Sequence, residues 1–183
     1  MTEQVLHIDF IAVTPEAGDG GREEILSQAA VALAIDGVVA VGAIDADEGS
    51  NFDLGVYFVL EGFTYLEPFG TDARYVRFLQ GTIAPRLKVF AGADVSLDEP
   101  FDATLPYASC LALEAPPQTY DWEVRERLST WVEAVDGERV IGLAVGERQR
   151  YRGLAMVFAD AALSSKPGSH DGTIVAGKAR RLA

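Results

Sequence analysis

Residues 5–13 read Val-Leu-His-Ile-Asp-Phe-Ile-Ala-Val, and this stretch decides the fold. Successive side chains of a β-strand point to opposite faces, so the odd-numbered residues share one face and the even-numbered residues share the other. Both faces are rich in apolar side chains, which is typical of a strand covered on both sides. The odd-numbered face also carries His7 and Asp9. Because an unpaired carboxylate is costly to bury, we expect Asp9 to have a structural partner or a chemical role.

The composition indicates a soluble globular protein with one large domain or two small ones. The chain has 183 residues, of which 49% are hydrophobic and 23% are charged. No apolar run is long enough to cross a bilayer, and residues 1–4 do not begin a secretory leader. The single cysteine, Cys110, is expected to be a buried small hydrophobe in a reducing compartment. These features predict a cytoplasmic protein.

The net charge of −13 is unevenly distributed along the chain. Residues 1–100 carry −12 and residues 101–183 carry −1. An acidic protein repels phosphate backbones, so we expect no nucleic-acid partner and no membrane partner. The sequence also has no metal-ligand spacing, no glycine-rich phosphate loop and no nucleophilic triad order. We therefore expect neither a metal nor an organic cofactor.

The first hundred residues predict the element order β-α-β-β-α-β, the split βαβ plan of a ferredoxin-like domain. Thr71-Asp72 is expected to cap the second helix, and Gly81 to interrupt it. Residues 14–21 are expected to form a loop and residues 63–69 an irregular segment. The expected strands lie at 5–13, 38–44, 52–60 and 87–95, and the expected helices at 22–34 and 73–80.

The pattern then starts again at an offset near 100 residues, which indicates an internal repeat. Residues 161–171 are too short for a second helix, so the copy is degenerate and ends in an edge strand at 173–176. We expect an α+β, ferredoxin-like α/β-barrel of two tandem repeats that form an intramolecular pseudo-dimer. The domains are 1–100 and 101–183. The repeated strands lie at 108–115, 140–145 and 151–160, and the repeated helix lies at 122–135.

The chain resembles the Dabb family, the stress-responsive dimeric α/β-barrel domains, over residues 5–98. A degenerate second copy covers about 107–176. In that family two identical domains close a β-barrel between their sheets, so the resemblance implies that the second repeat replaces a partner chain. The resemblance is carried by His7-Ile8 in an apolar strand, the Asp36-Gly37 turn, Phe52–Glu61, and Thr71–Leu79 before Pro85.

Members of this family include enzymes that use no metal and no organic cofactor, such as a plant polyketide cyclase and a hydroxynitrile lyase. The resemblance implies a pocket between the sheet and its helices. His7 falls on the first-strand histidine of the cyclase, Phe69 on its tyrosine, and Tyr75 on its catalytic histidine. Phenylalanine cannot donate a proton and tyrosine is a poor base at neutral pH, so the cyclase mechanism does not transfer.

The candidate catalytic residues are His7, Asp9 and Tyr75. Asp9 can raise the basicity of His7 or act as the general base, or both residues can be structural and satisfied by other partners. Tyr75 can donate to a substrate oxygen or simply fill the core. The second copy has Ala108 and Cys110 at the positions matched to His7 and Asp9, so we expect any chemistry in the first half. The expected substrate-binding residues are Ile11, Val56, Phe58, Phe69 and Phe78.

Three arginines, Arg148, Arg150 and Arg152, alternate along a predicted strand. They can grip an anionic substrate or, as the charge asymmetry favours, pair with the acidic first half.

The favoured function is a cofactor-independent cyclase, lyase or isomerase that acts on a small molecule. The alternatives are an apolar-ligand-binding or stress-associated protein without catalysis, a cofactor-free monooxygenase, and a structural pseudo-dimer with a filled interior. We also expect that two pseudo-dimers can pair as a homodimer.

Overall fold

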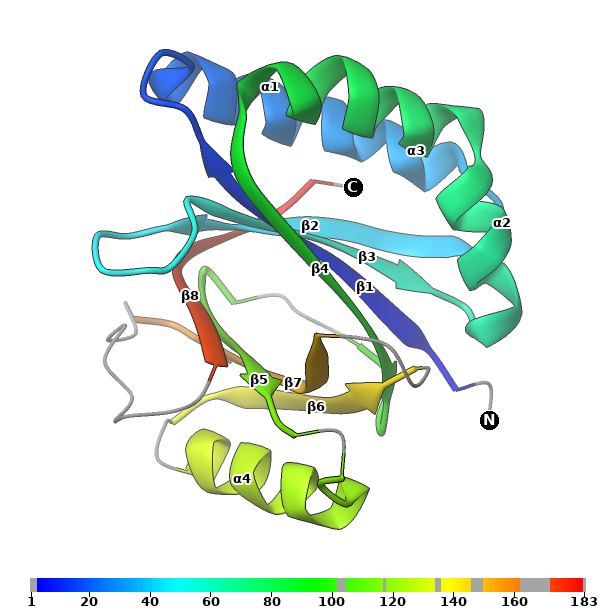
Figure 1. The fold of residues 1–183 in the computed structure, drawn as a ribbon, viewed down its shortest axis with the longest axis vertical. Helices are drawn as coiled ribbons and strands as arrows, with labels where there is room; N and C mark the ends of the chain where they lie inside the picture. The colour runs from blue at the N-terminus through cyan, green and yellow to red at the C-terminus, as the bar shows by residue number, and fades with distance from the viewer. Residues whose placement is uncertain are drawn as a thin grey trace.

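Eight strands form one closed barrel in the computed structural model, which describes residues 3–101, 105–116, 118–133, 136–145, 150–161 and 172–182 (Figure 1). The order around the barrel is β1-β3-β2-β8-β5-β7-β6-β4. The strands are β1 (Val5–Val13), β2 (Val38–Ala46), β3 (Leu54–Leu60), β4 (Leu87–Leu97), β5 (Tyr107–Glu114), β6 (Glu138–Ala144), β7 (Tyr151–Ala159) and β8 (Gly172–Arg181). The helices are α1 (Gly18–Ala29), α2 (Leu66–Thr71), α3 (Ala73–Arg77) and α4 (Asp121–Glu133).

The first four strands and their helices have the ferredoxin-like α+β arrangement that the sequence predicts. Their spatial order is β4-β1-β3-β2, and α1, α2 and α3 lie together on one face of this group (Figure 1). The other four strands have the order β8-β5-β7-β6, and α4 lies on their outer side (Figure 1). Each group therefore presents one face to its helices and the other to the barrel interior. The groups join at two seams, β2 with β8 and β4 with β6.

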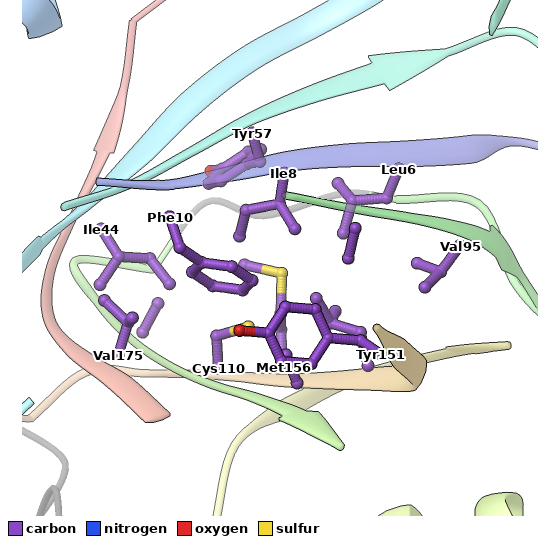
Figure 2. Close-up of a cluster of buried hydrophobic side chains, with 14 of the residues drawn as sticks. Leu6, Ile8, Phe10, Ile44, Tyr57, Val95, Cys110, Tyr151, Met156 and Val175 are labelled. Atoms are coloured by element: carbon purple, nitrogen blue, oxygen red, sulfur yellow. The ribbon is translucent and has the colours of Figure 1, made fainter. Parts of the chain in front are cut away.

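Strand β1 is covered on both faces, as its sequence predicts. It pairs with β3 on one side and with β4 on the other. Leu6, Ile8 and Phe10 point into the barrel interior, where they pack with residues of β5 and β7 (Figure 2). Val5 and Ile11 point the opposite way and pack beneath the helices. The position of His7 and Asp9 on the helix-facing side follows from this alternation.

Helix α1 begins at Gly18, earlier than the predicted residue 22, and its last predicted turn, Ala30–Ala34, is a 3-10 helix. Within this glycine-rich segment, Gly21 packs closely against its neighbours. A β-carbon at Gly21 would lie 2.8 Å from the β-carbon of Ala17 and 3.3 Å from Cδ of Arg86. Close tertiary packing therefore overrides the low helix propensity of glycine here.

The second helical region is longer and more broken than predicted. Residues expected to be irregular form a 3-10 turn, Phe63–Tyr65, and then α2. Asp72 ends α2 in an extended conformation and caps α3 as predicted, since its carboxylate accepts the Arg74 backbone N–H at 2.8 Å. The expected interruption at Gly81 is wrong, because a π-helical turn, Phe78–Ile83, runs through it. Its apolar residues are buried beneath the helices, and this packing holds the turn.

Strand β8 is not the edge strand that the sequence predicts. It pairs with β2 on one side and β5 on the other, and it runs from Gly172 to Arg181. One basic residue near its end, Arg180, has acidic partners on two other elements. Arg180 bonds Asp45 on β2 at 2.5 Å and Glu23 on α1 at 3.0 Å. The closed barrel thus leaves neither side of β8 open.

The residues matched to His7 and Asp9 in the second half face the wrong way. Ala108 and Cys110 point into the barrel interior, whereas Leu111 and Leu113 face α4. A shift of one residue in a strand moves every side chain to the other face, which explains the mismatch. By alternation Ser109 lies on the α4 side and is the better counterpart of His7. Cys110 is completely buried among apolar side chains, as predicted (Figure 2).

Gly42 on β2 makes room for Tyr57, which reaches into the barrel interior (Figure 2). A β-carbon at Gly42 would overlap the hydroxyl end of the Tyr57 side chain. We therefore expect Gly42→Ala to lower the free energy of unfolding by about 1–3 kcal/mol, measured by urea denaturation. Gly20→Ala in α1 is the control, because its β-carbon would meet no described atom within 4 Å. Equal unfolding free energies for Gly42→Ala and the wild type would contradict this assignment.

Candidate acid–base site

Four polar side chains from three elements meet on the helix-facing side of β1. His7 and Asp9 come from β1, Asp94 lies directly opposite His7 on β4, and Tyr75 comes from α3. Tyr75 reaches them because the Asp72 cap fixes the start of α3 above β1. The four residues are called the acid–base cluster below.

His7 is the centre of the acid–base cluster. Its Nδ1 lies 2.5 Å from Oδ1 of Asp94, and its Nε2 lies 2.7 Å from the Tyr75 hydroxyl oxygen and 3.1 Å from Oδ1 of Asp9. The Tyr75 hydroxyl donates to Oδ2 of Asp9 at 3.0 Å. Tyr75 thus accepts a hydrogen bond from His7 and passes one on to Asp9. This short chain of bonds satisfies every polar group that β1 buries here.

The two carboxylates differ in their access to solvent. The Asp9 side chain is completely buried, the His7 side chain is 15% exposed, and the Asp94 side chain is 25% exposed. A buried carboxylate is tolerated only when it is paired and hydrogen-bonded, and His7 and Tyr75 meet both conditions. A molecule that approaches from solvent therefore meets Asp94 and the edge of His7 first.

His7 is a cation at neutral pH. Burial disfavours the imidazolium, but the charge and hydrogen bond of Asp9, together with those of Asp94, outweigh burial and raise the pKa of His7 to about 10. Both ring nitrogens then carry protons, so Nδ1–H donates to Asp94 and Nε2–H donates toward Tyr75 and Asp9. Burial and the Asp9 carboxylate raise the pKa of the Tyr75 hydroxyl far above its ordinary value, so Tyr75 stays neutral.

The acid–base cluster combines a partly exposed carboxylate, Asp94, with a cationic imidazole, His7. A charge-assisted hydrogen bond as short as that between His7 and Asp94 is among the stronger side-chain interactions. Among the described residues, no group of three or more His, Cys, Asp or Glu side chains is placed to hold a metal ion.

All five expected substrate-binding residues are buried beside the acid–base cluster. They pack together with Tyr75, and the ring centroids of Phe69 and Tyr75 are 4.3 Å apart. His7 also contacts Phe69, edge to face, at 5.3 Å. The five residues are at most 6% exposed, so in this conformation they form core: Ile11, Val56, Phe58, Phe69 and Phe78.

Three cavities open elsewhere on the described part of the chain, and none of the three is lined by the acid–base cluster. The first, of about 640 Å³, lies between α4 and β6. The second, of about 410 Å³, lies beside the start of α1. The third, of about 370 Å³, lies beside Val5 and Ser96, at the end of the sheet next to His7 and Asp94.

Arg150, which precedes β7, and Arg152 on β7 pair with carboxylates of the second half. Arg150 bonds Glu114 at 2.7 Å and Arg152 bonds Asp121 at 3.3 Å, and both carboxylates belong to the second half. Arg148 lies outside the described residues. The first half is instead reached by Arg180, as described above, and by Arg125 on α4, which pairs with Asp98.

Asp94 is the member of the acid–base cluster that the sequence analysis missed. A usable signal was present, because Asp94 is a lone charge between Ala93 and Val95 in a predicted strand. In a ferredoxin-like order that strand lies antiparallel to the first one, and alternation puts Asp94 on the face of His7 only when the register is known.

No protein-family model and no curated protein sequence matches this chain. Several solved structures resemble it. An anthrone oxidase-like protein has a TM-score of 0.61 at 9% identity, over 88% of this chain and 74% of its own. A "putative monooxygenase" from Lactobacillus acidophilus has a TM-score of 0.55 at 10% identity, over 86% of this chain and 78% of its own.

A Dabb family protein with a ferredoxin-like fold, from Mesorhizobium loti, is also similar. Its TM-score is 0.45 at 14% identity, and the match covers 55% of this chain and all of that protein. At such identities these likenesses concern the fold. No helix among the described residues has the length and apolar character needed to cross a membrane.

The raised pKa of His7 predicts how stability depends on pH. His7 has an ordinary pKa of 6.5 and a folded pKa of about 10, so its contribution is complete below pH 6.5 and is lost as the pH rises toward 10. The free energy of unfolding should therefore fall over this range by a few kcal/mol. In His7→Gln this fall should be largely absent, as urea denaturation at pH 6 to 10 would show. A wild type and variant with parallel pH profiles would contradict a charged His7.

Proposed function

We propose that this protein is a cofactor-independent enzyme of the cyclase, lyase or isomerase type, which moves a proton on a small molecule at His7, Asp9, Tyr75 and Asp94. One observation carries the proposal. A cationic imidazole is held between two carboxylates, and only the side at Asp94 is open to solvent. Titratable groups with strongly shifted pKa values cluster at catalytic sites, and Asp94 is the carboxylate of this cluster that solvent reaches.

The proposed step begins with a substrate C–H or O–H proton beside an electron-withdrawing group. Asp94 takes this proton, and the electron pair stays on the substrate as an enolate or oxyanion. The His7 imidazolium, whose Nδ1 lies 2.5 Å from Asp94, stabilises through its positive charge the negative charge that develops on the substrate. Asp94 then returns the proton to a different atom of the substrate, so no proton or electron is lost. The substrate is rearranged without an oxidant, a reductant or a metal.

Asp9 and Tyr75 act through His7 in this proposal. Asp9 has no exposed surface, so it is a positioning residue that keeps His7 protonated and fixes its ring. Tyr75 bridges the two residues and holds α3 over the acid–base cluster. The roles differ from those of the cyclase in the resembling family, in agreement with the residue changes at Phe69 and Tyr75.

The shared fold supports a small-molecule enzyme. The similar structures include one named as anthrone oxidase-like and one named as a monooxygenase, so proteins of this shape are associated with chemistry on small organic molecules. Oxygen consumption would single out the monooxygenase alternative for this chain.

We further propose that the two halves are a tandem duplication that forms a pseudo-dimer, with the site in residues 1–100. The equivalent strand orders β4-β1-β3-β2 and β8-β5-β7-β6 support this origin. The second half offers Ser109 and Leu111 on its helix-facing side, and neither is ionisable at neutral pH. The second half then serves as scaffold. Pairing of two such chains as a homodimer stays a prediction.

Proton transfer can be tested without knowledge of the natural substrate. The wild type should speed hydrogen–deuterium exchange next to the carbonyl of small enolisable ketones such as cyclohexanone, followed by NMR in D2O. Asp94→Asn removes the base and should lower this rate by about 100-fold or more. His7→Gln should lower it similarly, because the positive charge that stabilises the developing enolate is lost.

Glu24→Gln is the matched carboxylate control, since Glu24 pairs with Arg86 on the surface away from the cluster. Glu24→Gln should exchange ketone protons at the wild-type rate and keep the wild-type unfolding midpoint, whereas His7→Gln should lower the midpoint because buried Asp9 loses its cationic partner. Exchange at the background rate in the wild type across a ketone panel would exclude this catalysis. It would favour the second candidate, a ligand-binding protein, which the complete burial of Asp9 also suits. Equal rates for Asp94→Asn and the wild type would exclude Asp94 as the base.

A further inference from the structure

Gly92 on β4 lies beside the acid–base cluster. It pairs directly with Asp9 on β1, and the neighbouring pair on the same face of the sheet is His7 with Asp94. A β-carbon at Gly92 would lie 3.7 Å from Oδ1 of Asp9 and 3.6 Å from the Ile8 carbonyl oxygen. The space above the Gly92 backbone therefore borders the acid–base cluster.

The helix-facing side of β4 is open around Gly92. Gly92 is exposed, and Phe90, the preceding residue on the same face, is 40% exposed. The alternate residues Ala91 and Ala93 are buried in the barrel interior. No helix of the described chain has an atom within 4 Å of the point where a β-carbon at Gly92 would lie. The helices that cover β1 therefore leave this part of β4 uncovered.

The fold itself does not require a glycine at residue 92. Its φ angle lies outside the left-handed region, and β4 pairs with β1 in regular register from Phe90 to Ser96. Both neighbours of a β-carbon here would be at ordinary contact distances. Glycine inside a strand lowers its stability and often marks a place where a ligand approaches the backbone closely. By contrast, a β-carbon would meet another atom within 3.0 Å at each of these strand glycines: Gly42, Gly142, Gly153, Gly172 and Gly177.

The neighbours of Gly92 along the strand limit the size and shape of a molecule that can lie on it. Phe90 and Asp94 are each two residues away on the same face, so their α-carbons are about 13 Å apart. Once the thickness of these two side chains is subtracted, the interval holds one flat ring. Aromatic rings pack well against each other in offset or edge-to-face arrangements, so the exposed Phe90 ring favours an aromatic group. The other end of such a molecule then lies beside the exposed edge of His7.

We propose that Gly92 is a specificity-determining residue, which keeps the acid–base cluster open and admits molecules whose carbonyl group is attached to a flat ring. The ring lies on the Gly92 backbone and against Phe90, and the carbonyl group faces His7. That these molecules are substrates rests on the proposed function, whereas the place where they bind does not. The location differs from the pocket that the sequence predicts, because the residues expected to line that pocket are packed as core.

Binding can be measured with acetophenone, in which a carbonyl group joins a flat ring to a methyl group with acidic protons. In an NMR titration, acetophenone should shift the Gly92 amide signal and the ring signals of Phe90 and His7 with one dissociation constant. Pinacolone is the matched control ligand, because it carries the same methyl ketone on a globular tert-butyl group. It should bind at least fivefold more weakly.

Two substitutions of graded size test the role of Gly92. Gly92→Ala should weaken acetophenone binding severalfold and Gly92→Leu should abolish it, because the added side chain fills the space above the strand. Exchange of the acetophenone methyl protons in D2O should fall in the same order. Both variants should keep or raise the unfolding midpoint, since a β-carbon has room here and glycine is a weak strand former.

Two controls separate blocked access from a damaged cluster. The His7 ring should stay protonated at pH 7 in both Gly92 variants, as its NMR signals would show. Gly20→Leu in α1 adds the same bulk where a β-carbon would meet no described atom within 4 Å, so it should bind acetophenone like the wild type.

Three outcomes would overturn the proposal. They are no shifts at Gly92 and Phe90 with acetophenone, equal binding by Gly92→Leu and the wild type, and a lowered unfolding midpoint in Gly92→Ala, which would show that the fold requires glycine. Failure of the proposed function looks different. If acetophenone binds over Gly92 but its methyl protons exchange at the background rate, the binding place stands and the catalysis fails. If Gly92→Leu and the wild type speed ketone exchange equally, the catalysis stands and the role of Gly92 fails.

Discussion

The structure is organised around one buried charge, the Asp9 carboxylate on β1. Strands β3 and β4 flank it and helices cover it, so water cannot solvate it. The protein compensates with a cation from the same strand and a hydroxyl from α3. His7 and Tyr75 therefore stabilise the fold by pairing with buried Asp9, in addition to any role in chemistry. A helix that must deliver a hydroxyl to one carboxylate has little freedom to slide or rotate, and the close packing of Tyr75 on Phe69 reinforces this.

The need to compensate the buried Asp9 carboxylate also links Asp9 to Asp94, on the other side of His7. Because Asp9 keeps His7 protonated, the outer nitrogen of His7 always has a proton to share with Asp94. A buried group that no ligand can touch thus sets the chemistry of an exposed one. Removal of Asp9 should change the protonation of His7 and therefore the hydrogen bond between His7 and Asp94. The two carboxylates thus behave as one coupled unit.

Local patterns in the sequence were enough for the parts of the fold that depend on alternation and capping. The two faces of β1 and the Asp72 cap followed from residues close in sequence. Features that depend on distant partners did not follow. Strand β8 is longer than predicted, and its Arg180 pairs with Asp45 on the neighbouring strand β2, far away in sequence. A π-helical turn passes through Gly81 and buries its apolar residues beneath the helices.

The residues of the acid–base cluster also divide into those that nearby sequence reveals and those that depend on distant strand pairing. His7, Asp9 and Tyr75 could be proposed from one sequence, since a strand pattern and a family resemblance marked them. Asp94 required the pairing of β1 with β4, and the faces of Ala108 and Cys110 required the register of β5. A shift of a single residue reverses a strand's faces, so sequence spacing alone cannot assign them.

The position of β8 between β2 and β5 has a consequence for how the chain folds. Arg180 and Asp45 are 135 residues apart in sequence, so this seam can form only after nearly the whole chain has emerged from the ribosome. Until then the apolar edge of β2 is open to strands of other molecules. Contacts this distant form slowly, because the entropy of closing a long loop must be overcome first. Chaperone demand and aggregation during synthesis should therefore respond more to changes in β8 than to changes of equal size in α4.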